Sequence, residues 1–130
     1  MTDACILLQR TTSKEQSRRL VAALLPKAFL ASHGGAIVEN HLNMIKANSS
    51  EPAVNPEVMT FVLNSYAADN AFRCISGSVA VSAFELQELP LPDMACMFEI
   101  ARLRLHGADR MTIEKCISAA YGIDDAAIPA

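Results

Sequence analysis

Tryptophan is absent from this chain of 130 residues, and aromatic residues make up only 5% of it. No uncharged apolar run approaches the roughly 18 to 20 residues that a membrane-spanning helix needs. The basic start and long apolar stretch of a secretory signal are also missing. Because 52% of the residues are hydrophobic and 19% are charged, the chain can still bury a core. We therefore expect a single cytoplasmic domain that covers residues 1–130 and contacts no membrane.

Paired cysteine motifs are missing too. The four cysteines are far apart in the sequence, contain no C-x-x-C pair, and form no zinc-binding pattern with the three scattered histidines. Cysteine is among the most frequently buried residue types. The sequence therefore predicts buried free thiols and no metal site at Cys5, Cys74, Cys96 and Cys116.

The common signatures of catalysis do not occur. We find no G-x-G-x-x-G, no P-loop, no H-E-x-x-H and no G-x-S-x-G. The carboxylates of Glu85 and Glu88 are one helical turn apart, a spacing that is common on solvated helix faces. The residues alone predict a module without a cofactor site or a visible active site.

Positive charge is in short supply. Eleven Lys and Arg against fourteen Asp and Glu give a formal net charge of −3. Proteins that bind nucleic acid on their own are usually basic, because their affinity depends on counterion release from the phosphates. This balance argues against autonomous DNA binding, although it leaves room for a locally basic face.

The first third of the chain is predicted to form two strands around a helix. The apolar residues 4–9 are typical of a buried strand. Thr12 and Glu15 have the spacing of a capping box, and an apolar stripe after them predicts a helix that Pro26 ends. Its members are Leu20, Val21, Leu24 and Leu25.

Alternation over residues 36–46 then predicts a half-buried strand after a turn at 32–35. Its apolar side carries Val38, Leu42 and Met44, and its polar side carries Glu39, His41 and Asn43. Asn40 falls on the apolar side, where it needs a hydrogen-bond partner.

The remaining chain is predicted to be mainly helical. Asn55 and Pro56 open a helix that runs to about Asp69, and residues 72–75 either continue it or are extended. Residues 79–82 are strand-like, and Ser82 caps a short helix through Glu85. Two further helices span 94–105 and 112–121, the first with core positions at Met94, Met97, Phe98, Ile100 and Leu103. The pattern indicates an α+β domain with a small mixed sheet and several packed helices.

Several segments, in this order, resemble a known family. They are residues 9–16, 38–43, 64–66, 70–73, 75–86, 89–92 and 120–123. Together they are similar to the C-terminal target-recognition region of bacterial adenine-specific DNA methyltransferases of restriction-modification systems. That region runs N-S-x…F-R…I-S-G-x-T-Q-V-N-A-x-D-L…L-P-x-P and closes with x-Y-G-L, and type I specificity subunits carry a related segment. Here the family's T-Q-V-N is replaced by Val79-Ala80-Val81-Ser82.

The resemblance implies a specificity-domain-like fold that reads double-stranded DNA and is not catalytic by itself. The family's F-x-G-x-G loop, which binds S-adenosylmethionine, and its N-P-P-[YF] segment are absent from this chain. The cofactor would therefore belong to a methyltransferase catalytic domain, joined in cis or in trans. A protein-interaction or oligomerisation module that keeps the fold without DNA binding is the alternative, favoured by the net negative charge.

For a recognition domain, polar residues on loops and exposed strand edges are the candidates for DNA contact. The first group lies at a strand-to-helix turn, and its alternative is a helix cap with solvated charges: Arg10, Thr11, Thr12 and Lys14. Arg18 and Arg19 extend this basic patch, or belong to a solvated helix face. The second group could read base edges, or could instead satisfy backbone groups and pack on the sheet edge: Asn40, His41 and Asn43. The third group surrounds a glycine turn, which could equally be structural: Arg73, Ser76 and Ser78.

Overall fold

The computed structural model describes residues 3–13 and 15–130, and within them the chain forms an α+β fold around a small sheet. The central strand β1 (Cys5–Gln9) pairs with β2 (Ala22–Leu25) on one side and β3 (Leu42–Ile45) on the other. Both pairings are antiparallel. The sheet is therefore antiparallel, and the predicted mixed sheet is wrong.

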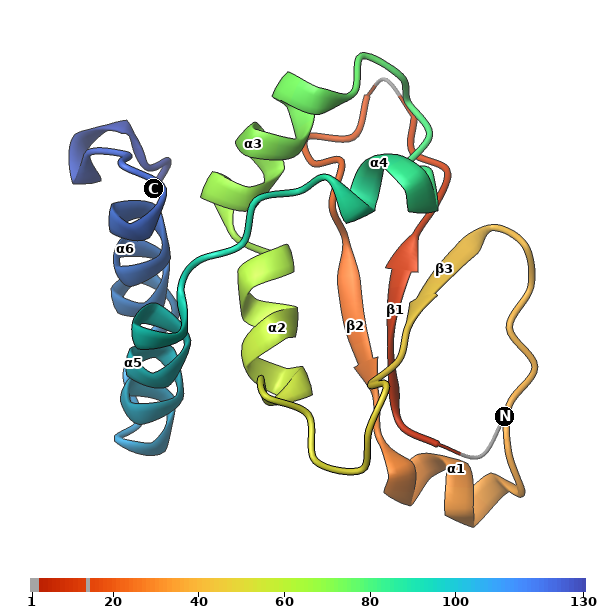
Figure 1. Cartoon of the computed structure of the whole chain (residues 1–130). Helices are drawn as coiled ribbons and strands as arrows, with labels where there is room; N and C mark the ends of the chain where they lie inside the picture. The colour runs from red at the N-terminus through yellow and green to blue at the C-terminus, as the bar shows by residue number, and fades with distance from the viewer. Residues whose placement is uncertain (1–2, 14) are drawn as a thin grey trace.

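Helices fill the space beside the sheet (Figure 1). The short helix α1 (Lys27–His33) follows β2, and α2 (Pro56–Leu63) and α3 (Tyr66–Ile75) lie between the sheet and a hairpin of two longer helices. After α4 (Ala83–Gln87), the hairpin is formed by α5 (Met94–Leu105) and α6 (Arg110–Ala120), and a single 3-10 turn, η1 (Asp125–Ala127), follows. In the described part of the chain, no helix is long and apolar enough to cross a membrane.

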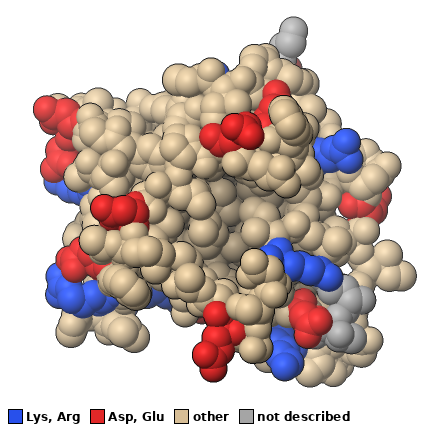
Figure 2. All heavy atoms as spheres, viewed as in Figure 1, with Lys and Arg blue, Asp and Glu red and all other residues tan. Residues whose placement is uncertain are grey.

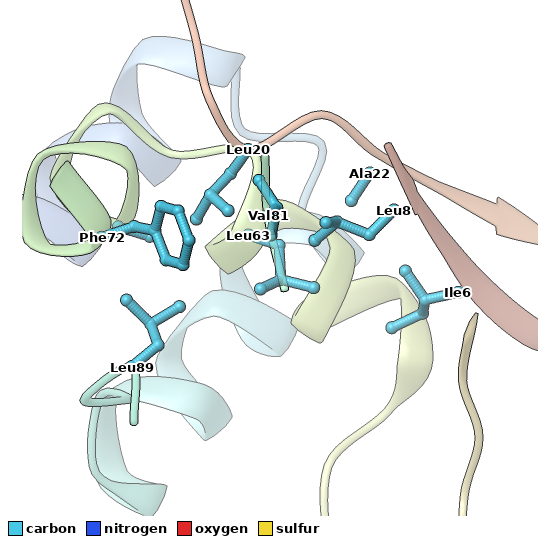
Figure 3. Close-up of a cluster of buried hydrophobic side chains, with 9 residues drawn as sticks. Ile6, Leu8, Leu20, Ala22, Leu63, Phe72, Val81 and Leu89 are labelled. Atoms are coloured by element: carbon cyan, nitrogen blue, oxygen red, sulfur yellow. The ribbon is translucent and has the colours of Figure 1, made fainter. Parts of the chain in front are cut away.

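Two hydrophobic clusters meet at α2. The sheet core gathers side chains from β1, β2, α3 and the segments around α4, which point toward one another in Figure 3; it contains Ile6, Leu8, Leu20, Ala22, Leu63, Ala68, Phe72, Val81 and Leu89. The helical core lies between α2, α5 and α6 and contains Val58, Val62, Ala67, Cys96, Met97, Ile100, Ile113 and Ile117. Leu63 faces the sheet core while Val58 and Val62 face the helical core, so α2 joins the two halves.

The helix predicted between Thr12 and Pro26 is wrong. The described residues of this segment form a loop and then β2, and Pro26 instead precedes α1, which the sequence analysis did not predict. The Thr12 hydroxyl donates to the carbonyl of Val79, so Thr12 does not cap a helix. Residue Leu20 is fully buried in the sheet core, where its backbone N–H donates to Asp69 Oδ1 at 2.8 Å. Contacts with a distant helix therefore override the local helical pattern.

The strand predicted over residues 36–46 is shorter than expected, and its two faces are reversed. Opposite residues of an antiparallel pair have side chains on the same face, and buried Leu8 lies opposite Asn43. Asn43 and Ile45 therefore face the sheet core, whereas Met44 is exposed. The Nδ2 of Asn43 is satisfied by donating to the carbonyl of Val81 at 2.8 Å.

The helix predicted from Pro56 to Asp69 is two helices. It begins as expected, because Asn55 Oδ1 accepts the N–H of Glu57 and Pro56 occupies the first turn. It ends at Leu63, and Ser65 then caps α3 by accepting the N–H of Ala68. The helix α3 includes residues 72–75, which the sequence left open.

Other local signals were correct. The capping box of Ser82 and Glu85 is present, α5 has the predicted bounds, and α6 begins two residues earlier than predicted with Asp109 as its cap. Residues 79–82 form no strand; an isolated bridge joins Ala80 to Thr11.

Burial differs from expectation at several apolar and thiol side chains. On α5, Met97 and Ile100 are buried as predicted, but Met94 and Phe98 are exposed. The four cysteines form no disulfide within the described residues: Cys5 and Cys96 are buried, Cys116 is half-buried and Cys74 is exposed. The prediction of buried thiols therefore holds fully for two of the four.

Candidate nucleic-acid interface

Three chain segments that carry candidate residues converge where β1 ends. The N–H of Arg10 donates to the carbonyl of His41 at 2.9 Å, and the N–H of Val81 donates to the carbonyl of Arg10 at 2.7 Å. The bridge between Thr11 and Ala80 adds a further link. We call this region the sheet end and define it as residues 10–12, 39–43 and 76–82.

Three candidates at the sheet end have fold roles. Thr12 is buried and donates to the Val79 carbonyl, and Asn43 donates to the Val81 carbonyl. Ser76 is buried, and its hydroxyl accepts the N–H of Ser78 at 3.3 Å. The bonds of Thr12 and Asn43 therefore anchor the segment before α4 to the rest of the sheet end, and that of Ser76 holds the turn within the segment.

The Glu85 carboxyl belongs to the same anchor. Hydrogen bonds from the hydroxyls of Ser82 and then Ser76 lower the pKa of Glu85 below its ordinary value. This carboxylate therefore stays ionised at neutral pH, where it fixes the start of α4 and the preceding turn.

The other candidates of the sheet end are exposed to solvent: Arg10, Thr11, Asn40, His41 and Ser78. An Nη of Arg10 lies 3.4 Å from the carbonyl of Asn40, which leaves the guanidinium charge without a carboxylate. His41 Nδ1 lies 3.1 Å from Glu39 Oε1, and both side chains are largely exposed. These side chains are exposed and can meet a ligand, with His41 paired to Glu39 and the Ser78 hydroxyl accepting the N–H of Ala80 at 3.1 Å, whereas the anchored ones are turned to the fold.

Arg18 and Arg73 make their contacts outside the sheet end, at a loop formed by residues 15–19 to which Arg18 belongs. Arg73 Nε donates to Asp69 Oδ2 at 2.8 Å, and Arg73 Nη2 donates to the Ser17 carbonyl at 2.9 Å. Arg18 Nη2 donates to the Asn64 carbonyl. Because Arg19 of the same loop donates to the Ser78 carbonyl at 2.7 Å, the loop also touches the sheet end. Lys14 lies outside the described residues.

A groove of about 1010 Å³ opens beside this loop, between α3, the start of α6 and residues 128–130. Arg18 and Arg73 line it together with Arg110, which the sequence analysis did not identify. Nothing in the local sequence marked Arg110, because a basic residue in a helical segment is ordinarily a solvated one. The groove depends on the packing of α6 near α3, which only the structure provides.

Charge on the molecule's surface is mixed. On the face drawn in Figure 2, Lys and Arg are interspersed with Asp and Glu, and no continuous patch of one sign is visible. Among residues 3–13 and 15–130, no group of three or more His, Cys, Asp and Glu side chains could hold a metal ion. A DNA interface here would depend on individually placed guanidinium and amide groups instead of a broad basic field.

No family model, curated protein or solved structure matches this chain. The relation to methyltransferase specificity domains is therefore a prediction from residue patterns. The structure shows where the described candidate side chains for DNA contact lie.

Proposed function

We propose that this chain is the DNA target-recognition domain of an adenine-specific, S-adenosylmethionine-dependent DNA methyltransferase, with a specificity-domain-like fold. It would read a short duplex site while a catalytic domain, in cis or in trans, binds the cofactor and flips the adenine. One observation carries the proposal: exposed polar candidates from three distant segments converge at the sheet end. A recognition surface needs this kind of convergence, because a duplex site is read by several side chains at once.

The chemistry of the exposed residues suits base reading. Arginine pairs with guanine and asparagine with adenine through two hydrogen bonds, each pair worth about 1–3 kcal/mol of discrimination. Arg10 and Asn40 can offer these groups, and His41 and Ser78 add a donor or acceptor beside them. The hydrogen bonds of Thr12 and Asn43 hold the backbone under these side chains, which lowers the entropy lost on binding.

The residues that resemble the methyltransferase family have a consistent physical role. Asn64 bonds to both backbone groups of Ala22, Ser65 caps α3, and Phe72 fills the sheet core. These positions support the fold, so they can be retained while base-reading residues change. The family's T-Q-V-N is replaced by residues 79–82 at the sheet end itself. A domain that reads a different DNA sequence would differ from its relatives at such positions.

A selection from a library of randomised duplexes tests the proposal. The wild-type chain should enrich one short motif, and Arg10→Ala should weaken or alter that motif. Lys27→Ala is the matched control, because Lys27 is an exposed cation on α1, outside the sheet end. Failure of the wild type to enrich any motif, even at low ionic strength, would overturn the proposal.

A second candidate function is supported by exposed apolar side chains. Phe84, Phe98 and Leu105 are 75%, 66% and 87% exposed, and the net charge is −3. These features suit a protein-interaction or oligomerisation module. Sedimentation over a range of concentrations would support this alternative if it shows a defined oligomer while the library selection yields no motif.

A further inference from the structure

The groove beside the 15–19 loop contains three guanidinium groups on three separate segments. Arg18 comes from the loop, Arg73 from α3 and Arg110 from the first turn of α6. Tyr66 and Met111 contribute apolar surface between them. Guanidinium groups on opposite walls of a groove can contact one anionic ligand from two sides.

Three side-chain carboxylates also line the groove; two of them accept hydrogen bonds from the protein, and of these two Asp69 has a cationic partner. Asp69 is buried and accepts the N–H groups of Arg19 and Leu20 as well as Arg73 Nε. Glu114 Oε1 accepts the N–H of Tyr66 at 2.8 Å. The third, Glu15, is an exposed residue of the loop.

Two of the arginines have no carboxylate partner. Arg18 bonds to a backbone carbonyl, which does not neutralise its charge. Arg110 makes no ion pair or side-chain hydrogen bond with any residue that the structure describes, and it is exposed. Their positive charge is therefore available to a ligand.

The hollow continues beyond this groove. A neighbouring cavity of about 310 Å³ shares Arg18, Arg110 and Glu114 with it, and a third of about 240 Å³ shares Phe61 and Asn64 with the second. The third cavity is lined by Arg104, whose guanidinium lies 5.1 Å from the centre of the Phe61 ring and is paired with Glu57 of the same cavity at 2.9 Å. The cations of this track that have no carboxylate partner are Arg18 and Arg110, and two such charges along connected hollows suit neighbouring phosphates of one chain better than a single small anion.

We propose that this groove binds the sugar-phosphate backbone of a nucleic acid strand, with Arg18 and Arg110 as phosphate contacts. The inference rests on the proposed function and adds a second contact region to the sheet end. Both regions touch the 15–19 loop, where Arg19 bonds to Ser78 and Arg73 bonds to Ser17. One duplex could therefore meet base-reading residues at the sheet end and phosphate contacts in the groove.

The test compares Arg110→Gln with Lys115→Gln, which removes a cation from the same helix at a position paired with Asp125. Binding is measured by fluorescence anisotropy against the selected duplex and a scrambled duplex, over a range of salt concentrations. Arg110→Gln should weaken both complexes by the same factor, and the slope of log K against log salt should fall in magnitude by about 0.9, the loss of one phosphate contact. Lys115→Gln should match the wild type, and all three proteins should have the same Tm.

The outcomes separate the two proposals. If the wild type binds duplex and Arg110→Gln has the affinity and salt slope of Lys115→Gln, the groove inference is wrong and the recognition proposal stands. If the wild type binds no duplex, both are wrong. Tighter binding of poly-glutamate than of DNA, lost in Arg110→Gln, would assign the groove to an acidic peptide and overturn the inference.

Discussion

The two halves of this molecule are held together in different ways. The sheet half depends on side chains that bond to backbone groups far away in the sequence: Asp69 bonds to Leu20 across 49 residues, and Asn64 to Ala22 across 42. In the helical half, the capping bonds span two or three residues, as for Asp93 with Cys96, and apolar burial joins α2, α5 and α6.

The difference follows from the size of the sheet. Its strands have only five, four and four residues, and such short strands need added support to be stable. Long-range polar bonds provide it, and the bond of Asn64 to both backbone groups of Ala22 also covers part of the β2 edge. The helical half needs less of this support, because each helix satisfies its own backbone.

The largest expected effect tests burial in the helical half. Ile100 is fully buried in α5, so Ile100→Ala should lower the free energy of unfolding by about 4 kcal/mol through lost burial and a cavity. Urea unfolding measures the change. Leu105→Ala on the same helix is the control and should cost little, because Leu105 is 87% exposed. Equal losses would mean that the helical core is not the source of stability.

Removal of the Asp69 side chain should have the next largest effect on stability. Asp69→Ala leaves the N–H groups of Arg19 and Leu20 and the guanidinium of Arg73 without their acceptor, and should cost about 3 kcal/mol. Glu99→Ala, which breaks an exposed pair with Arg102, should cost much less, because solvent screens the pair. Chemical denaturation of both variants gives the comparison. A loss for Asp69→Ala as small as that for Glu99→Ala would show that the Asp69 bonds do not stabilise the sheet half.

A smaller loss is expected from Asn64→Ala. Its amide makes two hydrogen bonds with Ala22, at 2.9 and 2.8 Å, so the variant should lose about 2 kcal/mol. The helix cap variant Asp109→Ala removes one local bond, to Thr112, and should lose less stability than Asn64→Ala. Thermal unfolding measures the loss of stability in both variants. A larger loss for Asp109→Ala than for Asn64→Ala would contradict the distinction between the halves.

The smallest expected effect at neutral pH comes from two buried groups of the helical half, which should lower the stability of the protein at alkaline pH. Burial, with the nearby Cys116, raises the pKa of Cys96 to about 12, and burial also raises the pKa of Tyr121 to about 12. In the unfolded chain the pKa of a cysteine thiol is about 8.5, and that of a tyrosine hydroxyl is about 10. Above these values the unfolded chain releases protons that the folded chain keeps, so stability should fall as pH rises toward 12.

Urea unfolding at a series of pH values measures this decline. Cys96→Ala should make it shallower, whereas Cys74→Ala, at an exposed thiol, should leave it unchanged. A Cys96→Ala profile identical to that of the wild type would show that the buried thiol has no part in it.

The sequence predicted the helical half better than the sheet half, for a physical reason. The cap at Asn55 and the bounds of α5 depend on neighbours within a few residues. The strand β2 was mistaken for a helix because Thr12 and Glu15 have the spacing of a capping box. Its true conformation depends on Asn64 and Asp69, whose positions in space no local pattern contains.

The candidate site was predictable to a similar extent. Arg10 and His41 could be named as polar residues near strand ends, but their meeting with residues 76–82 needed the fold. The inward orientation of Asn43 was missed because alternation alone does not say which face is buried. Arg110 had no sequence signal, since its groove depends on how α6 packs near α3.

We propose that anchored residues hold the sheet end while exposed ones contact DNA. The most direct measurement gives Tm and duplex affinity side by side for Asn43→Ala and His41→Ala. We predict that Asn43→Ala lowers Tm, because the Val81 carbonyl loses its donor, and that His41→Ala lowers affinity at an unchanged Tm. A lower Tm for His41→Ala with full affinity, together with a stable Asn43→Ala that no longer binds, would contradict the claim.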